Sequence, residues 1–282
     1  MSDMLREFTS YGRFILPLLR VKKEIVPERV QWGSKHQYYL YYTAPERRSE
    51  MAVIYLHGGG WNSHHASDFH YIGQFFAKSG YDCILLNYRK VPKVRYPDII
   101  GDVFEGFCAL RKSVASGRGR NGGYVVIGSS AGAHLGALLC YDTDLQRQYK
   151  VSPNIFKGYL GLAAPLCFDA PRTWVLESLL RGLFRSKKRE DWKQGEPVTK
   201  LRRGQKVPTL LIHSRHDGLI GLAQAKKFCA AAAHVGIRAR LCEVETSKNT
   251  HTVYSCGIFF ETPQTSQTLD WVMKQVKIWS LR

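Results

Sequence analysis

Ser130 stands in a pattern that is typical of an activated nucleophile. It is flanked symmetrically by Gly128 and Gly132 in the segment GSSAG, which matches G-x-S-x-G. An apolar, β-branched run precedes this segment and a helical pattern follows it, so the serine would lie on a sharp turn between a strand and a helix. Such a turn needs small flanking residues and lifts the hydroxyl out of the sheet. Ser129 is the competing serine, but it lacks the symmetric glycine spacing.

A second motif could stabilise the negative charge that attack by this serine would create. The first long apolar run, from Met51, ends in the sequence HGGGW at residues 57–61. Three glycines after a strand can be a tight turn and nothing more, but they also let the backbone approach a substrate oxygen with no Cβ in the way. We expect the N–H groups of Gly59 and Gly60 to form an oxyanion hole with that of Ala131, the residue after the nucleophile.

The base that would activate the serine is sought among the late histidines, because hydrolases with this nucleophile motif follow the chain order serine, acid, histidine. His234 lies in the alanine-rich helical pattern FCAAAAHVG, which is typical of a structural histidine. His251 lies in the polar segment TSKNTHTVYS, just after the last expected strand. A polar loop there could reach the ends of the strands, so His251 is the predicted base.

The acid that would orient this histidine is predicted at Asp217. This residue follows the apolar run PTLLIHS, and its carboxylate would stabilise the charged imidazole during the reaction. Asp169, after the run FKGYLGLAA, is the alternative, because some hydrolases carry the acid one strand earlier. With Asp217 the chain order becomes Ser130, Asp217 and His251, as the motif requires.

The remaining histidines are less suggestive of chemistry. His64, His65 and His70 follow the glycine-rich turn and could line a pocket, but their spacing matches no common metal motif, so no metal site is predicted. His134, one turn after the nucleophile, is interpreted as a helix-packing residue. We interpret the two histidines that flank the acid, His213 and His216, as loop or supporting residues.

The elements that must position these residues alternate from Met51 onward. Six apolar, β-branched runs are expected strands: residues 51–57, 81–88, 123–129, 156–164, 208–214 and 238–244. Helical patterns lie between or after them: residues 69–80, 97–116, 222–236 and 264–279. Before them, residues 30–32 and 37–45 surround the turn-like GSKH and predict an antiparallel hairpin. This order predicts an α/β fold with a mostly parallel sheet flanked by helices, in a single domain over residues 1–282.

One segment interrupts this alternation, at about residues 170–206. Its first part, TWVLESLLRGLFRS, is apolar at helical spacing, and the rest is polar and basic. An insertion of this kind after a strand predicts a small helical cap or lid. Residues 181–206 contain only three acids, Glu190, Asp191 and Glu196, against ten lysines and arginines. The ten are Arg181, Arg185, Lys187, Lys188, Arg189, Lys193, Lys200, Arg202, Arg203 and Lys206.

The formal net charge of the whole chain is +18, which is compatible either with an anionic partner or with plain solubility. No helix-turn-helix, zinc-finger or RNA-binding signature accompanies the charge, so no nucleic-acid partner is expected. No apolar run is long enough to span a membrane. The segment Phe14–Leu19 is too short for the core of a signal peptide, and the seven cysteines form no CxxC pair. A cytoplasmic protein is therefore expected, and its oligomeric state is left open.

Together these motifs resemble a known group of enzymes. HGGGW, NYR, YPDIIGDV, GSSAGAHLG and HSRHDGLI, followed by a late histidine, resemble the hormone-sensitive-lipase-like and bacterial feruloyl/acetylxylan-esterase-like α/β-hydrolases. The resemblance extends from about Tyr38 to the C-terminus. It implies the α/β-hydrolase fold and carboxylesterase activity without a cofactor. It also assigns Ser130, Asp217 and His251 as the catalytic triad.

The same resemblance assigns Gly59, Gly60 and Ala131 as oxyanion donors and gives Asp102 a structural role in the helix after NYR. The chain departs from the usual pattern in having Ser129 before the nucleophile and Leu219-Ile220-Gly221 after the acid.

The leading functional hypothesis is a serine hydrolase that cleaves small carboxylic esters, with a short acyl, acetyl or aryl group, through an acyl-enzyme. An anionic ester is one candidate substrate, because the basic segment could attract it. The alternatives are an amide hydrolase of the arylformamidase type and a non-catalytic binding protein on a hydrolase scaffold. The last alternative usually lacks the base or the nucleophile, whereas this chain has a candidate for each role.

Overall fold

The computed structural model describes Glu7 and residues 21–117, 122–245, 250–260 and 265–281. The apolar segment Phe14–Leu19 therefore lies outside the described residues. Among the helices of the described part, none is long and apolar enough to cross a membrane.

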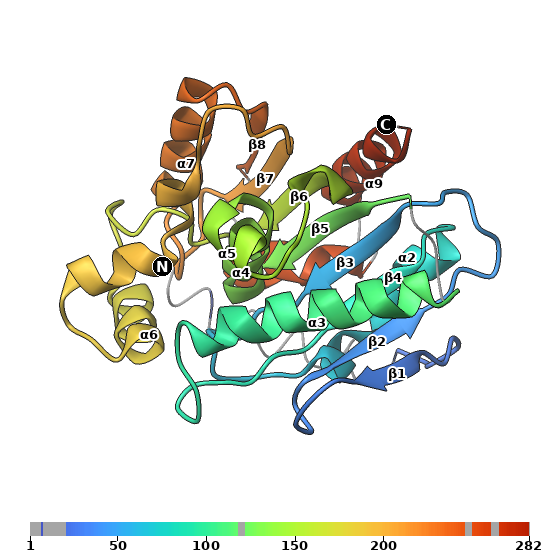
Figure 1. The fold of residues 1–282 in the computed structure, drawn as a ribbon. Coiled ribbons are helices and arrows are strands. Elements are labelled where there is room, and N and C mark those ends of the chain that lie inside the picture. The colour runs from blue at the N-terminus through green and yellow to red at the C-terminus, as the bar shows by residue number, and fades with distance from the viewer. Residues whose placement is uncertain (1–6, 8–20, 118–121, 246–249, 261–264, 282) are drawn as a thin grey trace.

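One eight-stranded sheet forms the centre of the molecule, with the spatial order β1-β2-β4-β3-β5-β6-β7-β8 (Figure 1). The strands are β1 (Glu28–Gln31), β2 (Tyr38–Tyr42), β3 (Ala52–Leu56), β4 (Cys83–Leu86), β5 (Tyr124–Ser129), β6 (Phe156–Leu162), β7 (Thr209–Ser214) and β8 (Ala239–Val244). β1 pairs antiparallel with β2, and β2 pairs antiparallel with β4. The strands from β3 onward are parallel. The predicted mostly parallel sheet with an N-terminal antiparallel pair is confirmed.

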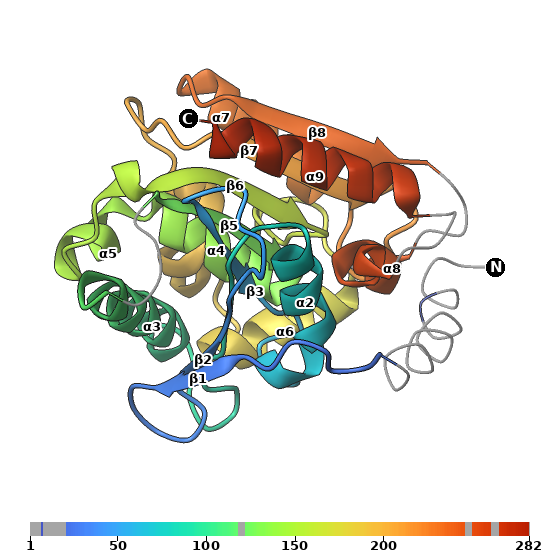
Figure 2. The ribbon, with the colours of Figure 1, turned by 90° about the vertical axis from the view of Figure 1, so that its right-hand side faces the viewer.

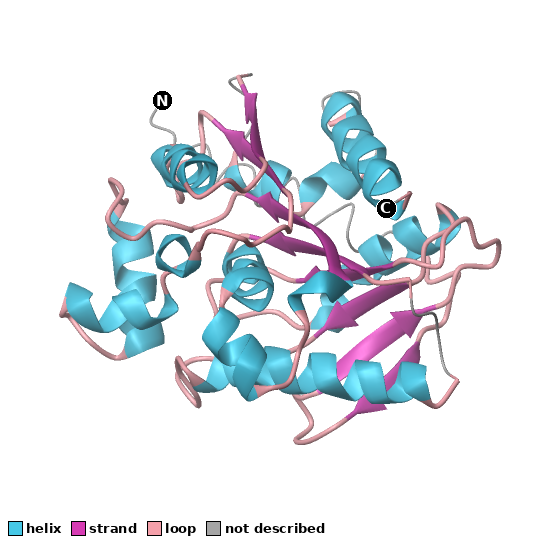
Figure 3. Cartoon of the chain, turned by 45° about the horizontal axis from the view of Figure 1, so that its top comes forward, coloured by secondary structure: helices cyan, strands magenta, loops and turns pink. Residues whose placement is uncertain are grey.

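Helices cover both faces of the sheet (Figures 2 and 3). One face packs against α3 (Asp98–Ala115), α4 (Ala131–Tyr141), α5 (Thr143–Gln148), α6 (Trp174–Phe184) and α7 (Ala223–His234). The other face packs against η1 (Ala66–Phe69), α2 (His70–Lys78), α8 (His251–Ser255), η5 (Gly257–Phe259) and α9 (Ser266–Ser280). A further 3₁₀ helix, η2 (Pro153–Ile155), precedes β6.

The central strands read as unbroken apolar runs because both of their faces are buried. In β3, Ile54 and Leu56 pack toward the side of α3 and α4, whereas Val53 and Tyr55 pack toward the side of α2 and α9. Burial of this kind contributes roughly 1.5–3 kcal/mol for each large apolar side chain. It fixes the strands whose carboxyl ends carry the candidate site.

The segment 170–206 contains α6 and two 3₁₀ helices, η3 (Arg189–Gly195) and η4 (Pro197–Lys200). Thr173 caps the start of α6 by accepting a hydrogen bond from the Leu176 N–H, at 3.1 Å. The buried side of α6 contributes Leu176 and Leu180 to the core. Its remaining apolar side chains include two that reach the candidate site described below.

The basic side chains of residues 181–206 do not form one patch. Arg181 pairs with Glu177 on α6, 3.1 Å away, near the carboxyl ends of the strands. Arg203 and Lys206, by contrast, line a hollow at the amino ends of β6 and β7, on the opposite edge of the sheet. Only part of the charge therefore lies on the side of the sheet where the candidate site is found.

Candidate active site

Ser130 lies at the sharp turn between β5 and α4. Its backbone has a φ of 50° and a ψ of −119°, a strained combination for a residue with a side chain. The turn leaves no space for larger neighbours, because a Cβ on Gly128 would collide with the backbone of Gly132 and Ala133, and a Cβ on Gly132 with that of Leu56. These close contacts explain why the G-x-S-x-G pattern needs both glycines.

The structure brings Ser130, Asp217 and His251 into one chain of hydrogen bonds. The Ser130 Oγ atom lies 2.9 Å from Nε2 of His251, and Nδ1 of His251 lies 2.8 Å from Oδ2 of Asp217. An ionised carboxylate only accepts hydrogen bonds, so Nδ1 carries the proton. The lone pair of Nε2 is then free to accept the proton of the Ser130 hydroxyl.

Asp217 lies in the turn after β7, and its side chain is wholly buried. Its Oδ1 atom accepts hydrogen bonds from the N–H groups of Leu219 and Ile220, at 2.9 and 2.7 Å. Burial alone would raise the pKa of Asp217, but the imidazoles of His251 and His213 outweigh it and hold this pKa well below its ordinary value. The carboxylate is therefore ionised over the whole physiological range.

His251 is the first residue of the short helix α8, and not part of a loop as expected. Burial would lower the pKa of His251, but the charge and the hydrogen bond of Asp217 raise it above its ordinary value, with a smaller contribution from Glu7. The prediction of a loop was wrong because the residues before His251 are polar, as in a loop, and the helix HTVYS that follows is too short to give a periodic pattern.

The alternative residues lie elsewhere. His234 is exposed at the end of α7, and Asp169 is exposed beyond β6. Ser129 is buried, and its hydroxyl is hydrogen-bonded to the hydroxyl of Tyr55, 2.7 Å away, and to the carbonyl oxygen of Ser255. None of the three forms a hydrogen bond with His251 in the part of the chain that the structure describes.

The glycine-rich turn after β3 faces the nucleophile. Gly59 and Gly60 have φ values of 114° and 56°, which residues with side chains rarely adopt. The Gly59 carbonyl oxygen stabilises the turn by accepting hydrogen bonds from the backbone N–H groups of Asn62 and Ser63, both at 3.0 Å. Among the described residues, none accepts a hydrogen bond from the N–H groups of Gly59, Gly60 or Ala131. These three N–H groups are therefore available to donate hydrogen bonds to an oxygen atom of a substrate.

A histidine that the sequence marked only as a packing residue also supports this turn. His134 on α4 is fully buried, donates from Nε2 to the Gly195 oxygen at 2.7 Å and accepts from the Trp61 indole N–H at 3.3 Å. Burial lowers the pKa of His134 to about 4, so the ring is neutral at physiological pH. It links the glycine-rich turn to the segment that contains η3, and its interpretation as a packing residue agrees with these contacts.

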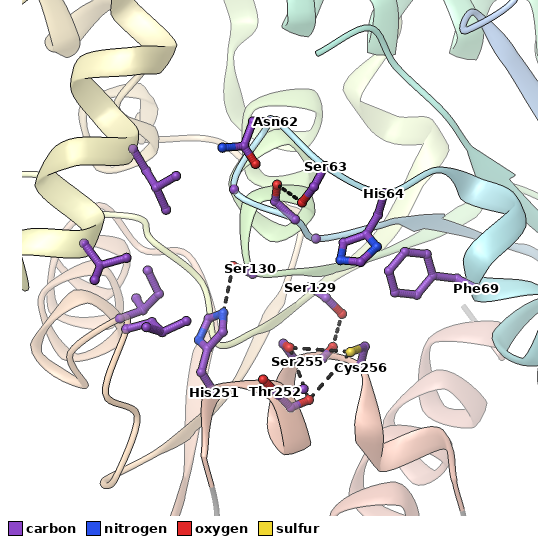
Figure 4. A pocket seen from close by; sticks show the side chains of 17 residues that line it. Asn62, Ser63, His64, Phe69, Ser129, Ser130, His251, Thr252, Ser255 and Cys256 are labelled. Carbon is purple, nitrogen blue, oxygen red and sulfur yellow. Dashed lines mark hydrogen bonds between the residues drawn. The ribbon is translucent and has the colours of Figure 1, made fainter. Parts of the chain in front are cut away.

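A cavity of about 220 Å³ opens beside Ser130 (Figure 4). On one side it is lined by the glycine-rich turn with Asn62, Ser63 and His64, and on another by Ser129, Thr252, Ser255 and Cys256. Apolar side chains complete the lining: Phe69, Val175, Leu179, Leu219 and Ile220. Val175 and Leu179 belong to α6. Among the described residues that line it, none is a lysine or an arginine.

Two further residues lie beside this site. His213, interpreted as a loop or supporting residue, belongs to β7 and lies 3.4 Å from the Asp217 carboxylate, which agrees with a supporting role. Glu7 is buried beside His251 although it lies 244 residues earlier in the chain. In the sequence Glu7 is only a glutamate near the beginning of the chain, and this feature is too common to indicate a role in the site. Among the described residues, no group of histidine, cysteine and acid side chains could hold a metal ion.

The arrangement of strands and helices has close counterparts among solved structures. Esterase B from Lactobacillus rhamnosis matches 99% of this chain and 95% of its own with a TM-score of 0.77 at 18% identity. A truncated carbohydrate esterase from gut microbiota matches 92% and 99% with a TM-score of 0.74, also at 18% identity. The BD-FAE family model matches residues 39–160, which contain the glycine-rich turn and Ser130. The chain therefore has the α/β-hydrolase fold.

Relatives of this α/β-hydrolase include esterases. Esterase LipQ of Mycobacterium tuberculosis is 25% identical over 203 residues, which are 68% of this chain and 48% of that protein. Isoprenylcysteine alpha-carbonyl methylesterase ICME of Arabidopsis thaliana is 25% identical over 225 residues, 75% of this chain and 51% of that protein. The chain spans about half the length of the curated relatives it matches. Its resemblance to the hormone-sensitive-lipase-like esterases is confirmed by these matches.

Proposed function

We propose that this α/β-hydrolase is a serine esterase that cleaves small carboxylic esters through a covalent acyl-enzyme. The observation that carries the proposal is the hydrogen-bonded chain from Ser130 through His251 to Asp217, at the mouth of a cavity. The named esterases among its relatives support the same reaction.

In the first half of the proposed reaction, Ser130 is the nucleophile. Its Oγ attacks the ester carbonyl carbon while Nε2 of His251 takes the hydroxyl proton. The imidazolium that forms is stabilised by the Asp217 carboxylate. The carbonyl oxygen becomes negatively charged and accepts hydrogen bonds from the N–H groups of Gly59, Gly60 and Ala131, which typically contribute roughly 100- to 1,000-fold to the rate.

The tetrahedral intermediate then collapses. The bond to the alcohol oxygen breaks, the alcohol leaves with the proton from Nε2 of His251, and the acyl group stays on Ser130. In the second half, His251 takes a proton from water, whose oxygen attacks the acyl carbon. The Ser130 oxygen leaves with that proton, so the enzyme is regenerated and the acid is released.

The dimensions of the cavity favour small substrates. Its volume of about 220 Å³ is below the roughly 300–1,000 Å³ of pockets that bury drug-sized ligands. Its walls are mostly apolar, as an acyl chain or an aromatic ring requires. We therefore propose short acyl, acetyl or aryl esters as substrates. Residues 170–206 would serve as a small cap, because Val175 and Leu179 close one side of the cavity from α6.

Since no lysine or arginine is found among the described lining residues, we propose that an anionic substrate would be attracted from outside the cavity. The cap carries exposed cations that could do this, among them Lys187 and Lys188. Their effect would be long-range and sensitive to salt. It would act on the association of the substrate and not on the chemical step.

The experiment that tests the proposal is intact-mass spectrometry after treatment with a fluorophosphonate. The wild type should gain one adduct, Ser130→Ala should gain none, and Ser129→Ala, the matched control, should still react. A panel of phenyl acetate and N-formylkynurenine then separates ester from amide hydrolysis. No adduct on the folded wild type would contradict the proposal and favour a non-catalytic binding protein. Turnover of the amide alone would replace the esterase by an arylformamidase.

A further inference from the structure

Glu7 lies against the candidate active site, far in the sequence from the residues it contacts. Its side chain is 4% exposed. One carboxylate oxygen, Oε1, accepts a hydrogen bond from the backbone N–H of His251 at 2.5 Å and another from that of Gly218 at 3.2 Å. Glu7 therefore connects the residue proposed as base with the residue next to the proposed acid, Asp217.

These two backbone positions belong to different elements. His251 begins α8, and Gly218 lies in the turn after β7. The hydrogen bond between the His251 and Asp217 side chains depends on the distance between those elements. A single oxygen that binds both N–H groups fixes that distance from the backbone side, independently of the side-chain pair. The base and the acid are thus held together twice.

Accepting two hydrogen bonds from backbone N–H groups does not require a carboxylate. A neutral carbonyl or amide oxygen could accept both bonds, whereas a carboxylate brings a charge into a buried place at a cost in desolvation. The second oxygen, Oε2, has no hydrogen-bond partner among the described residues. Burial accordingly raises the pKa of Glu7, while the bond from the His251 N–H and the His251 ring act in the opposite direction.

The groups that surround the Glu7 carboxylate explain why a charged side chain lies here. Among the described residues, the ionisable groups around Glu7 are the imidazole of His251 and the carboxylate of Asp217, and Asp217 in turn contacts His213. A negative Glu7 is attracted to the imidazolium that forms when His251 takes a proton. It is repelled by Asp217, which holds its own charge between two imidazoles.

We propose that Glu7 is a positioning residue of the site. It holds the turn that contains Asp217 against the start of α8, and it stabilises the charged form of His251. The proposal rests on the proposed function. Glu7 acts on the reaction through His251 and through the backbone of Gly218, next to Asp217. Glu7 would thereby become part of the active site, although the motifs that carry the resemblance begin about thirty residues later, at about Tyr38.

The test separates the hydrogen bonds of Glu7 from its charge. Glu7→Gln keeps an oxygen acceptor of the same size but loses the charge, whereas Glu7→Leu loses both. Glu24→Gln is the matched control, because Glu24 pairs with Lys78 on the surface. Two quantities are measured for each protein: the pKa of His251 by NMR titration, assigned with Ser130→Ala and His251→Gln spectra, and the pH profile of kcat/KM for phenyl acetate.

In Glu7→Gln the pKa of His251 should fall by about one pH unit, and the acidic limb of kcat/KM should move with it. Its kcat/KM above this limb should stay within about threefold of the wild type. In Glu7→Leu, kcat should fall by about 10- to 100-fold at every pH, with KM little changed, because the base is misplaced. Glu24→Gln should match the wild type in all respects.

An unchanged His251 pKa in folded Glu7→Gln would overturn the proposal, because a purely structural contact would leave that value in place. Full activity of Glu7→Leu would overturn it as well. The NMR measurement needs no turnover. A wild type that neither reacts with a fluorophosphonate nor cleaves esters would therefore contradict the proposed function, while the titration would still decide the role of Glu7.

Discussion

The imidazole of His213 lies 3.4 Å from the Asp217 carboxylate, on the same oxygen, Oδ2, that binds His251. Its Nε2 also donates a hydrogen bond to the Ile220 oxygen at 2.7 Å, so this nitrogen carries a proton. Asp217 thus accepts hydrogen bonds from His251 and from two backbone amides, and the imidazole of His213 lies against the same carboxylate. This environment keeps the carboxylate ionised although it is fully buried.

Asp217→Asn should lower kcat by about a thousand- to ten-thousandfold, because the amide no longer favours the tautomer with a proton on Nδ1 of His251. The fold should be retained, since an amide oxygen can still accept from the Leu219 and Ile220 N–H groups. Asp169→Asn, the same change at the exposed alternative, should keep wild-type kinetics. Steady-state rates on phenyl acetate measure both. The reverse pattern would transfer the role of acid to Asp169.

The pH dependence of kcat/KM should have an acidic limb with its midpoint above pH 6.5. His251 must be neutral to accept a proton, and its pKa is raised by Asp217, so activity falls as the pH falls through this raised value. His57 and His134 do not interfere, because burial lowers their pKa values to about 3 and about 4. A rate profile from pH 4 to about pH 9 is the measurement. A midpoint at or below 6.5 would contradict the assignment.

His251 and Asp217 also make the free energy of unfolding depend on pH. For His251 this dependence has the opposite direction to that of activity. Because folding raises the pKa of His251, its contribution to the free energy of unfolding is complete below about pH 6.5 and is lost as the pH rises through the raised value. Folding lowers the pKa of Asp217, so its contribution is present above about pH 4 and is lost on acidification. Activity and the stabilising effect of His251 therefore change in opposite directions across the acidic limb.

Local patterns predicted the parts of the site that are defined by backbone geometry. The strained turn at Ser130 leaves a trace in the sequence, because only glycine fits at Gly128 and Gly132. The strands were equally clear, because burial on both faces produces unbroken apolar runs. The start of α8 at His251 was missed, since a five-residue helix has too few residues for a periodic pattern.

Contacts between distant segments could not be predicted from one sequence. Glu7 reaches His251 across 244 residues, and nothing in either local pattern indicates the other. Such pairings are set by tertiary packing, which leaves no period in the chain.

The ion pair between the half-buried Arg89 and the buried Asp102 should contribute to stability. Asp102 is fully buried and accepts hydrogen bonds from the Arg89 guanidinium, the closest at 2.7 Å, and from Gln37 at 3.0 Å. Asp102→Ala should lower the free energy of unfolding by about 2–3 kcal/mol, because these donors lose their partner. Urea unfolding measures the change. The exposed pair of Asp144 with Arg147 is the control, and Asp144→Ala should cost less than about 1 kcal/mol.

Salt should weaken the binding of an anionic ester if the cations of the cap attract it. The KM of such a substrate should then rise between low and physiological salt, while that of a neutral ester stays constant. The double change Lys187→Gln with Lys188→Gln should remove much of this dependence. Changing Arg203 and Lys206 to glutamine is the control, because they lie at the opposite edge of the sheet. Equal salt dependence for both esters would refute the attraction.

The side chain of Leu179 should limit the size of the substrate. It lines the cavity from α6, and its methyl groups would lie 3.0 and 3.3 Å from a Cβ on Gly60, so it lies directly against the glycine-rich turn. Leu179→Ala should therefore raise kcat/KM for p-nitrophenyl octanoate relative to the acetate by about tenfold, as the removed methyl groups make room for a longer chain. Trp174→Ala is the control on the same helix, because Trp174 is 68% exposed and does not line the cavity. Equal ratios of the two rates in Leu179→Ala and the wild type would show that α6 does not set the chain length. In that case the opposite wall, with Thr252 and Cys256, would be the next to change.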